Sequence, residues 1–271
     1  MLVVLLVLPA CSGCNGRLVP PMPGPSAQRE AYHMCDVLET ARQAGLSRDS
    51  LFVDVGAHIG SIAMIANAHG HAVVSFECRL GAAHSIVTRP WWTPNGTLPR
   101  LPASVKLVST CVSDHTGLGG LYRALDSSSM TPTWNQGNQI YWKARRDGAV
   151  SSTIIEAVPV VRLDDALSNR SLTTLGLPAH VGFIKSDTNG NDRAVMRGAA
   201  ATLREHKPVV YFERSGCGAA GCTDKGSSTA ECALLDELGL RGLGYSCFCD
   251  DQDCLWFPAA VRINANKLMS K

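Results

Sequence analysis

A short apolar segment that ends in glycine constrains this chain more than any other feature. Leu51 to Val55 is typical of a strand buried on both faces, and Gly56 follows it directly. Gly60 then stands at the head of an expected helix, Ser61 to Ala68. Glycine lets the main chain approach a ligand at Gly56 and permits tight helix packing at Gly60. We therefore expect a ligand at the carboxyl end of this strand.

Strand and helix signals alternate along most of the chain, which predicts an α/β fold with a mostly parallel sheet flanked by helices. The expected strands are Ala72–Phe76, Val105–Ser109, Val158–Arg162, Val181–Ser186 and Val209–Glu213, and the expected helices are Glu30–Ala44, Asp164–Ser168 and Asp192–Arg204. Two stretches, Arg89–Pro102 and Asp126–Gly148, lack a clear period and are expected to be irregular.

The last part of the chain is rich in cysteine. A helix from Ala230 to Leu238 and strands at Leu243–Phe248 and Leu255–Phe257 would complete a seven-stranded sheet. Disulfides between its loops are the favoured interpretation, with connectivity open, and zinc is the alternative. The six cysteines are Cys217, Cys222, Cys232, Cys247, Cys249 and Cys254.

The amino-terminal run Met1–Ala10 is apolar but too short to cross a bilayer, so it resembles a signal-peptide core and predicts no stable membrane span. The sequons at Asn95 and Asn169 and the cysteines favour the secretory lumen or secretion, with cytoplasm or a bacterial envelope as alternatives. We expect a leader (1–16), a linker with a helix (17–49), a core (50–215) and a cysteine-rich part completing the sheet (216–271). A net charge of +2 without a basic face argues against nucleic acid as a partner.

The strand after the glycine loop ends in an acid, Glu77, which is placed to accept hydrogen bonds from two ribose hydroxyls. Together the two features predict a nucleoside ligand. The glycines are spaced Gly-x-x-x-Gly, unlike the Gly-x-Gly-x-x-Gly that directs amides at a dinucleotide pyrophosphate. A nicotinamide-dependent reductase is therefore disfavoured.

A second polar strand end lies at residues 182–192. The expected strand finishes with Lys185 and Asp187, whose charges would meet at the edge of the site. The alternative is that Asp187 and Asn189 only cap the following helix. Asp164 and Asp165 either cap their own short helix or support the site.

These segments, in this order, resemble the FkbM-type methyltransferases. His58 stands where that family more usually has asparagine, and Asn189 stands where it usually has glutamate or glutamine. The matching segments are residues 52–60, 73–77, 105–117, 161–167, 185–190, 197–199 and 208–213.

The resemblance implies a Rossmann-like class I methyltransferase fold and methyl transfer from S-adenosylmethionine to a hydroxyl of a glycan or another small molecule. Asp187 is the expected base or acceptor-orienting group and Lys185 its partner, with His58 an alternative base and no metal required. A luminal binding protein that keeps the fold without catalysis is the rival function. The expected cofactor-binding residues are Asp54, Gly56, Ala57, His58, Gly60, Glu77 and Ser113.

Overall fold

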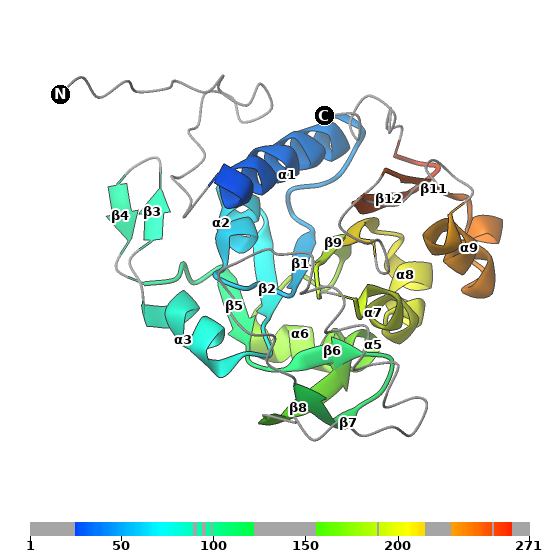
Figure 1. The fold of residues 1–271 in the computed structure, drawn as a ribbon. Helices are drawn as coiled ribbons and strands as arrows, with labels where there is room; N and C mark the ends of the chain where they lie inside the picture. Colours follow the sequence, from blue (N-terminus) through cyan, green and yellow to red (C-terminus); the bar gives the residue numbers. More distant parts are fainter. Residues whose placement is uncertain are drawn as a thin grey trace.

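The computed structural model describes residues 25–88, 91–93, 96–98, 100–121, 156–188, 190–214, 229–250 and 252–261 (Figure 1). Several features predicted from the sequence lie outside these residues. They are the leader, the sequon at Asn95, the stretch 126–148, Asn189, Cys217 and Cys222.

The core of the fold is a seven-stranded sheet in the order β11-β12-β10-β9-β1-β2-β5. The pairs from β10 through β9, β1 and β2 to β5 are parallel, and β12 runs antiparallel to both β10 and β11. This confirms the predicted mostly parallel sheet. The strands are β1 (Leu51–Val55), β2 (Ala72–Phe76), β5 (Val105–Val108), β9 (Val181–Ser186), β10 (Val209–Glu213), β11 (Tyr245–Cys249) and β12 (Asp253–Pro258).

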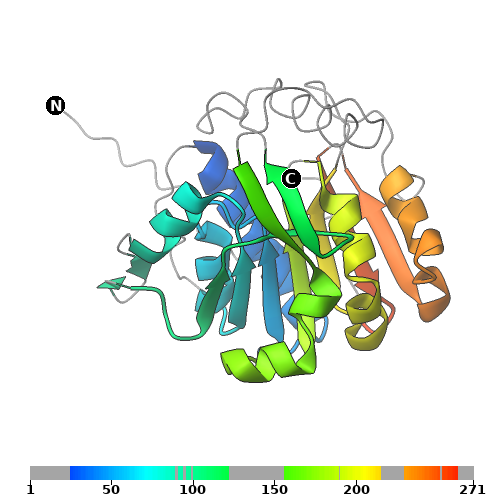
Figure 2. The same ribbon diagram turned by 90° about the horizontal axis from the view of Figure 1, so that it is seen from below.

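Helices cover both faces of the sheet (Figures 1 and 2). On one face, α1 (Pro25–Gln43) and α2 (Ser61–Ala68) pack with alternate strand residues such as Phe52 and Phe183, whose rings stack. The strand residues that point the other way pack under the remaining helices of the core. These are α5 (Leu163–Ala166), α6 (Asn169–Leu175), α7 (Asp192–Gly198), α8 (Ala200–His206) and α9 (Ala230–Glu237), while α3 (Leu80–Thr88) follows β2 and the 3-10 helix η2 (Arg241–Leu243) precedes β11.

The single helix expected over Asp192–Arg204 is two helices, α7 and α8, which meet at Ala199. The carboxylate of Asp164 accepts hydrogen bonds from the amides of Ala201 and Thr202 and from the Thr202 hydroxyl. Because Asp164 satisfies these first-turn amides, α8 can begin anew after the break. Asp164 therefore caps a helix distant in sequence, and the alternative in which it caps its own short helix is wrong.

Two small sheets lie outside the main one. The strand β8 (Glu156–Arg162) pairs with β6 (Cys111–Ser113) and β7 (Gly117–Leu121) and does not join the seven-stranded sheet. Within the stretch expected to be irregular, β3 (Trp91–Thr93) pairs with β4 (Gly96–Leu98). The expectation was wrong for these residues, because the high strand propensity of tryptophan and threonine outweighs the neighbouring prolines.

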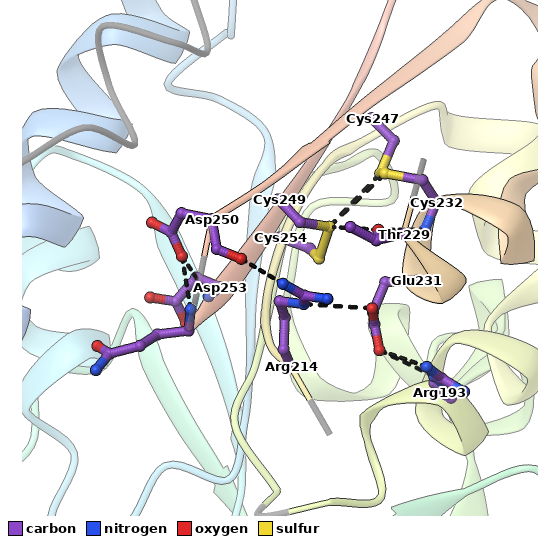
Figure 3. A network of polar contacts seen from close by, with 11 residues as sticks. Arg193, Arg214, Thr229, Glu231, Cys232, Cys247, Cys249, Asp250, Asp253 and Cys254 are labelled. Atoms are coloured by element: carbon purple, nitrogen blue, oxygen red, sulfur yellow. Dashed lines mark hydrogen bonds and ion pairs between the residues drawn. A yellow bond between two sulfur atoms is a disulfide. The ribbon is translucent and has the colours of Figure 1, made fainter. Parts of the chain in front are cut away.

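Disulfides cross-link several parts of the described chain. Cys232–Cys247 joins α9 to β11, and Cys249–Cys254 joins β11 to β12, so disulfides form in the cysteine-rich part as predicted (Figure 3). Cys78–Cys111, which was not predicted, joins the end of β2 to β6, and Cys35 is disulfide-bonded as well. In the described part of the chain no helix is long and apolar enough to cross a membrane.

Buried charges also tie the cysteine-rich part to the core (Figure 3). Arg214, directly after β10, donates to the Glu231 carboxylate and to the Asp250 carbonyl oxygen. Glu231 also accepts from Arg193 on α7. Glu231 and Arg214 are both buried, so each offsets the desolvation of the other.

The Asp164 cap gives a direct test of the break between α7 and α8. Replacing Asp164 with alanine leaves the first amides of α8 without acceptors, so the free energy of unfolding should fall by about 1–2 kcal/mol. Urea denaturation followed by circular dichroism measures this. The matched control is Asp165→Ala, which removes one exposed hydrogen bond from Thr116 and should cost less than about 1 kcal/mol. Equal losses in the two variants would contradict the capping role.

Candidate active site

The glycine loop between β1 and α2 turns sharply. Gly56 and Gly60 have φ of 76° and 78°, and His58 has φ of 50°, all in the left-handed region. The amides of Gly56 and Ala57 both donate to the Phe76 carbonyl oxygen over 3.0 Å, and Gly60 donates to Ala57. The loop is therefore held to the end of β2 by its own main chain.

Gly56 is required for a reason that the sequence did not reveal. A Cβ atom at this position would overlap the carbonyl oxygen of Asp187, which crosses from β9. Close packing of protein on protein therefore requires glycine at position 56, and the approach of a ligand to Gly56 stays a prediction. Gly60 caps α2 in a left-handed conformation. This backbone angle is sufficient to explain a glycine at position 60, without the tight helix packing that was expected.

Glu77 lies directly after β2 and is buried. One carboxylate oxygen accepts from the His58 amide over 2.7 Å and the other from the Arg79 amide over 2.8 Å. Burial raises the pKa of Glu77, and these two amides oppose the increase. Each oxygen keeps a further lone pair, so the carboxylate is oriented and still able to accept more hydrogen bonds.

Lys185 lies between two carboxylates. Its Nζ is 3.6 Å from Asp54 Oδ1 and 3.5 Å from Asp187 Oδ2, and it donates to the Gly56 carbonyl oxygen over 3.3 Å. Burial raises the pKa of Asp54, and the charge of Lys185 opposes this increase. A buried ammonium group with these neighbours locks the strand ends of β1 and β9 to the glycine loop.

Exposure separates the roles of these three charged groups. The Asp54 side chain is 0% exposed and that of Lys185 4%, whereas that of Asp187 is 34% exposed. A bound molecule can therefore contact the Asp187 carboxylate directly. It could interact with Asp54 only indirectly, through the residues that cover Asp54. The Asp187 amide donates to the Val55 carbonyl oxygen over 3.0 Å, which fixes the main chain of Asp187.

Asp192 organises the loop after β9. Its buried carboxylate accepts from the Ser186 hydroxyl over 2.6 Å and from the amides of Thr188 and Gly190. Burial, together with the nearby charge of Asp187, raises the pKa of Asp192 to about 6, against the hydrogen bond from Ser186. Asn191 is the N-cap residue of α7, so the alternative in which Asp187 caps this helix is wrong.

Glu213, at the end of β10, belongs to the same polar edge. The pairing of Phe212 with Ser186 places Glu213 beside Asp187, and the two carboxyl groups share a hydrogen bond. Burial, and then the charges of Asp187 and Asp192, raise the pKa of Glu213 far above its usual range. At neutral pH Glu213 is therefore a protonated acid, and it donates to the Asp187 carboxylate.

The remaining predicted residues lie nearby in different settings. Ala57 is buried, and His58 exposes its side chain at the rim of the loop. Ser113 ends β6, is buried and donates to the Asp114 carboxylate over 3.3 Å. Its carbonyl oxygen lies where a Cβ on Gly198 would stand, so Ser113 also packs against α7. A cofactor contact for Ser113 and a base role for His58 stay predictions.

The Methyltransferase FkbM domain, as a sequence-family profile, matches residues 54–232. The chain belongs to the FkbM methyltransferase family. The match begins at Asp54, in β1, and ends at Cys232, so it covers the glycine loop, Glu77 and the polar edge formed by Lys185, Asp187 and Glu213.

Solved structures with a similar fold include methyltransferases whose sequences have low identity to this chain. FkbM methyltransferase from Methylobacillus flagellatus KT has a TM-score of 0.40 and 14% identity over 88% of this chain and 56% of its own. This chain thus spans little more than half the length of that protein. The N-terminal domain of human METTL16, solved with SAH, has a TM-score of 0.39 and 11% identity over 90% of this chain and 73% of its own. No curated protein sequence matches this chain.

Glu213 and Asp192 were not among the candidate site residues predicted from the sequence, although both lie at this polar edge of the FkbM-family chain. A signal for Glu213 was present, because Val209–Glu213 is an apolar strand that ends in an acid, as the strand before Glu77 does. Asp192 gave no comparable signal, since an acid in the first turn of a helix is ordinary.

The buried Asp192 carboxyl predicts a pH dependence of stability. Its pKa rises from 3.8 in the unfolded chain to about 6 in the fold, so the folded state binds this proton more tightly. The resulting stabilisation is full below about pH 4 and is lost as the pH rises through about 6. Asp192→Asn should therefore flatten the change in unfolding free energy between pH 4 and 7, measured by urea denaturation. A variant with the unchanged wild-type slope would contradict this assignment.

Proposed function

We propose that this FkbM-family protein binds S-adenosylmethionine and methylates a hydroxyl of a carbohydrate or another small molecule. The observation that carries the proposal is the position of Asp187. It is the solvent-accessible member of a charged trio at the strand end that contacts the glycine loop. A base at this position lies next to the edge where Glu77 can hold a nucleoside.

The hydrogen bonding of the glycine loop fits a ligand without a pyrophosphate. The amides of Gly56, Ala57, His58 and Gly60 all donate within the protein. A dinucleotide site needs such amides free to face the phosphates. S-adenosylmethionine makes no such demand, and its ribose hydroxyls can donate to Glu77.

The charge of the site also suits this donor. Asp54 and Asp187 outnumber the single ammonium group of Lys185, and Glu77 and Asp192 lie on the same edge of the sheet. S-adenosylmethionine supplies a methyl group made electrophilic by a positively charged sulfur. A surplus of carboxyl groups favours the binding of that positive charge.

The polar edge accounts for proton removal from the acceptor. The Asp187 carboxylate would accept the hydroxyl proton as the oxygen takes the methyl group. Lys185 holds this carboxylate from one side and the protonated Glu213 holds it from the other. Both contacts fix the position of the Asp187 carboxylate before the acceptor arrives.

A pair of variants separates cofactor binding from proton transfer. Glu77→Ala should weaken S-adenosylmethionine binding at least about tenfold in calorimetry, because hydrogen bonds to a charged group are lost. Asp187→Asn should retain binding and lose turnover by a factor of about 10²–10⁴. Glu205→Ala and Asp49→Asn, both exposed, are the matched controls and should behave as wild type.

Turnover is measured by transfer of radiolabelled methyl groups to a panel of glycans and small alcohols. Failure of the wild type to bind S-adenosylmethionine would remove the proposal. Binding without transfer to any acceptor would favour the rival binding protein. Normal turnover by Asp187→Asn would exclude Asp187 as the base.

We also propose that the protein folds in an oxidising compartment of the secretory route. The disulfides Cys78–Cys111, Cys232–Cys247 and Cys249–Cys254 support this, because such bonds rarely persist in cytosol. Asn169 is exposed at the start of α6 and available for glycosylation. The protein expressed in insect cells should be luminal or secreted, and endoglycosidase should remove less mass from Asn169→Gln than from the wild type, because only the sequon at Asn95 remains in the variant. A cytosolic product with free thiols would contradict it.

A further inference from the structure

We infer that the Cys78–Cys111 disulfide is a positioning element of the cofactor site, which holds Glu77 ready for the ribose of the nucleoside. The inference rests on the proposed function, since it assumes that this edge binds S-adenosylmethionine. A covalent bond that no sequence pattern predicted would thereby contribute to ligand affinity.

The bond lies where the sheet stops supporting the chain. Phe76 pairs with Val108 at the last register position of β2 and β5, and the Glu77 amide then donates to the Val108 carbonyl oxygen over 3.2 Å. Beyond that hydrogen bond the two chains leave the ladder. The disulfide joins them again one residue after Glu77, with a Cα–Cα distance of 4.6 Å between Cys78 and Cys111.

Cys78 is also the central residue of the turn that orients Glu77. The Arg79 amide donates to the Glu77 carboxylate over 2.8 Å, so the turn closes across Cys78. The other carboxylate oxygen is held by the His58 amide from the glycine loop. One side of the carboxylate is thus fixed by the loop after β1 and the other by a turn that the disulfide anchors to β6.

The far end of the bond is itself firmly held. Cys111 begins β6, which pairs with β8, and the neighbouring Val112 carbonyl oxygen accepts from the Asn191 side chain over 2.9 Å. Thr110 donates to the Pro159 carbonyl oxygen over 2.9 Å. Because Cys111 is held by these contacts, the disulfide restricts the position of Cys78, which a bond to a loose loop would not do.

The side of Glu77 towards β5 is the one left for the base of a nucleoside. The glycine loop approaches Glu77 from the side of β1, through the hydrogen bond from the His58 amide. Leu80, two residues beyond Cys78, is 62% exposed and offers apolar surface on this side. A purine has a face that can cover such surface.

The disulfide is also open to chemistry from solvent. Cys78 and Cys111 are only partly buried, whereas all four sulfur-bearing residues of the carboxyl-terminal disulfides are buried. A small dithiol, which is oxidised to its own disulfide, or a phosphine, which is oxidised to the phosphine oxide with oxygen from water, should therefore reduce Cys78–Cys111 to two thiols before either carboxyl-terminal disulfide. Cofactor affinity would then depend on the oxidation state of one bond.

Calorimetry with S-adenosylmethionine tests the inference on the full chain. The double variant C78S/C111S frees the turn, and binding must then order it, so we expect affinity to fall about tenfold. The control is C232S/C247S, which removes a buried disulfide away from Glu77. The control should be less stable to urea and should bind with the wild-type Kd.

A double-mutant cycle distinguishes positioning from general destabilisation. If the disulfide acts through Glu77, E77Q should cost much less affinity in the C78S/C111S background than in the wild type. Additive losses, or an unchanged Kd in C78S/C111S, would overturn the inference while leaving the proposed function intact. Absence of binding by the wild type would instead overturn the proposed function.

A second route covers failure of the double variant to fold. Native wild-type protein is treated briefly with a phosphine reductant and alkylated, and mass spectrometry identifies the molecules modified at Cys78 and Cys111 alone. These should bind S-adenosylmethionine about tenfold more weakly than untreated protein. Wild-type affinity in this fraction would overturn the inference.

Discussion

A buried ammonium group joins the two central strands of this protein, and the candidate site is built around it. Lys185 pairs with Asp54 across the β1–β9 ladder, and its Nζ also reaches Asp187 and the Gly56 carbonyl oxygen. A charge in an apolar interior is costly unless opposite charge and hydrogen bonds surround it. The glycine loop and the end of β9 are therefore held together, and with them the exposed carboxylate of Asp187.

The acids around this group divide by environment. The Asp187 carboxylate reaches solvent, whereas the Asp192 carboxylate accepts hydrogen bonds from residues that follow β9. Glu213 is kept protonated by burial and by the neighbouring acids. A protonated acid beside an ionised one is a common way to hold a proton acceptor in place. The amides of Gly56, Ala57, His58 and Gly60 in the glycine loop donate within the protein, so under the proposed function ligand recognition depends on Glu77 and the surrounding side chains.

Disulfide bonds hold strand ends together beyond the last hydrogen bonds of the sheet. The Cys78–Cys111 bond continues the β2–β5 pair past its last ladder position, and the two carboxyl-terminal disulfides fix the hairpin that pairs with β10. Arg214 and Glu231 add a buried ion pair between the same parts (Figure 3). Each link stabilises a strand end that carries an acid of the site, Glu77 on one side and Glu213 on the other.

The sequence by itself determined the central strands and the glycine loop. The bounds of β1, β2, β9 and β10 agree with the expected ones, because a short apolar run between polar residues fits only a buried strand. Lys185, Asp187 and Glu77 could be found because parallel strands place their carboxyl ends on one edge. The resemblance of these segments to the FkbM-type methyltransferases supported the same prediction.

Only the tertiary structure decided which distant residues meet. The reason for Gly56 lies in the carbonyl oxygen of Asp187, the break between α7 and α8 depends on Asp164, and the partner of Cys78 is Cys111. The protonated state of Glu213 likewise depends on acids from other segments of the chain. Local sequence fixes periodicity and composition, whereas burial and charge arise from contacts between segments that no local pattern records.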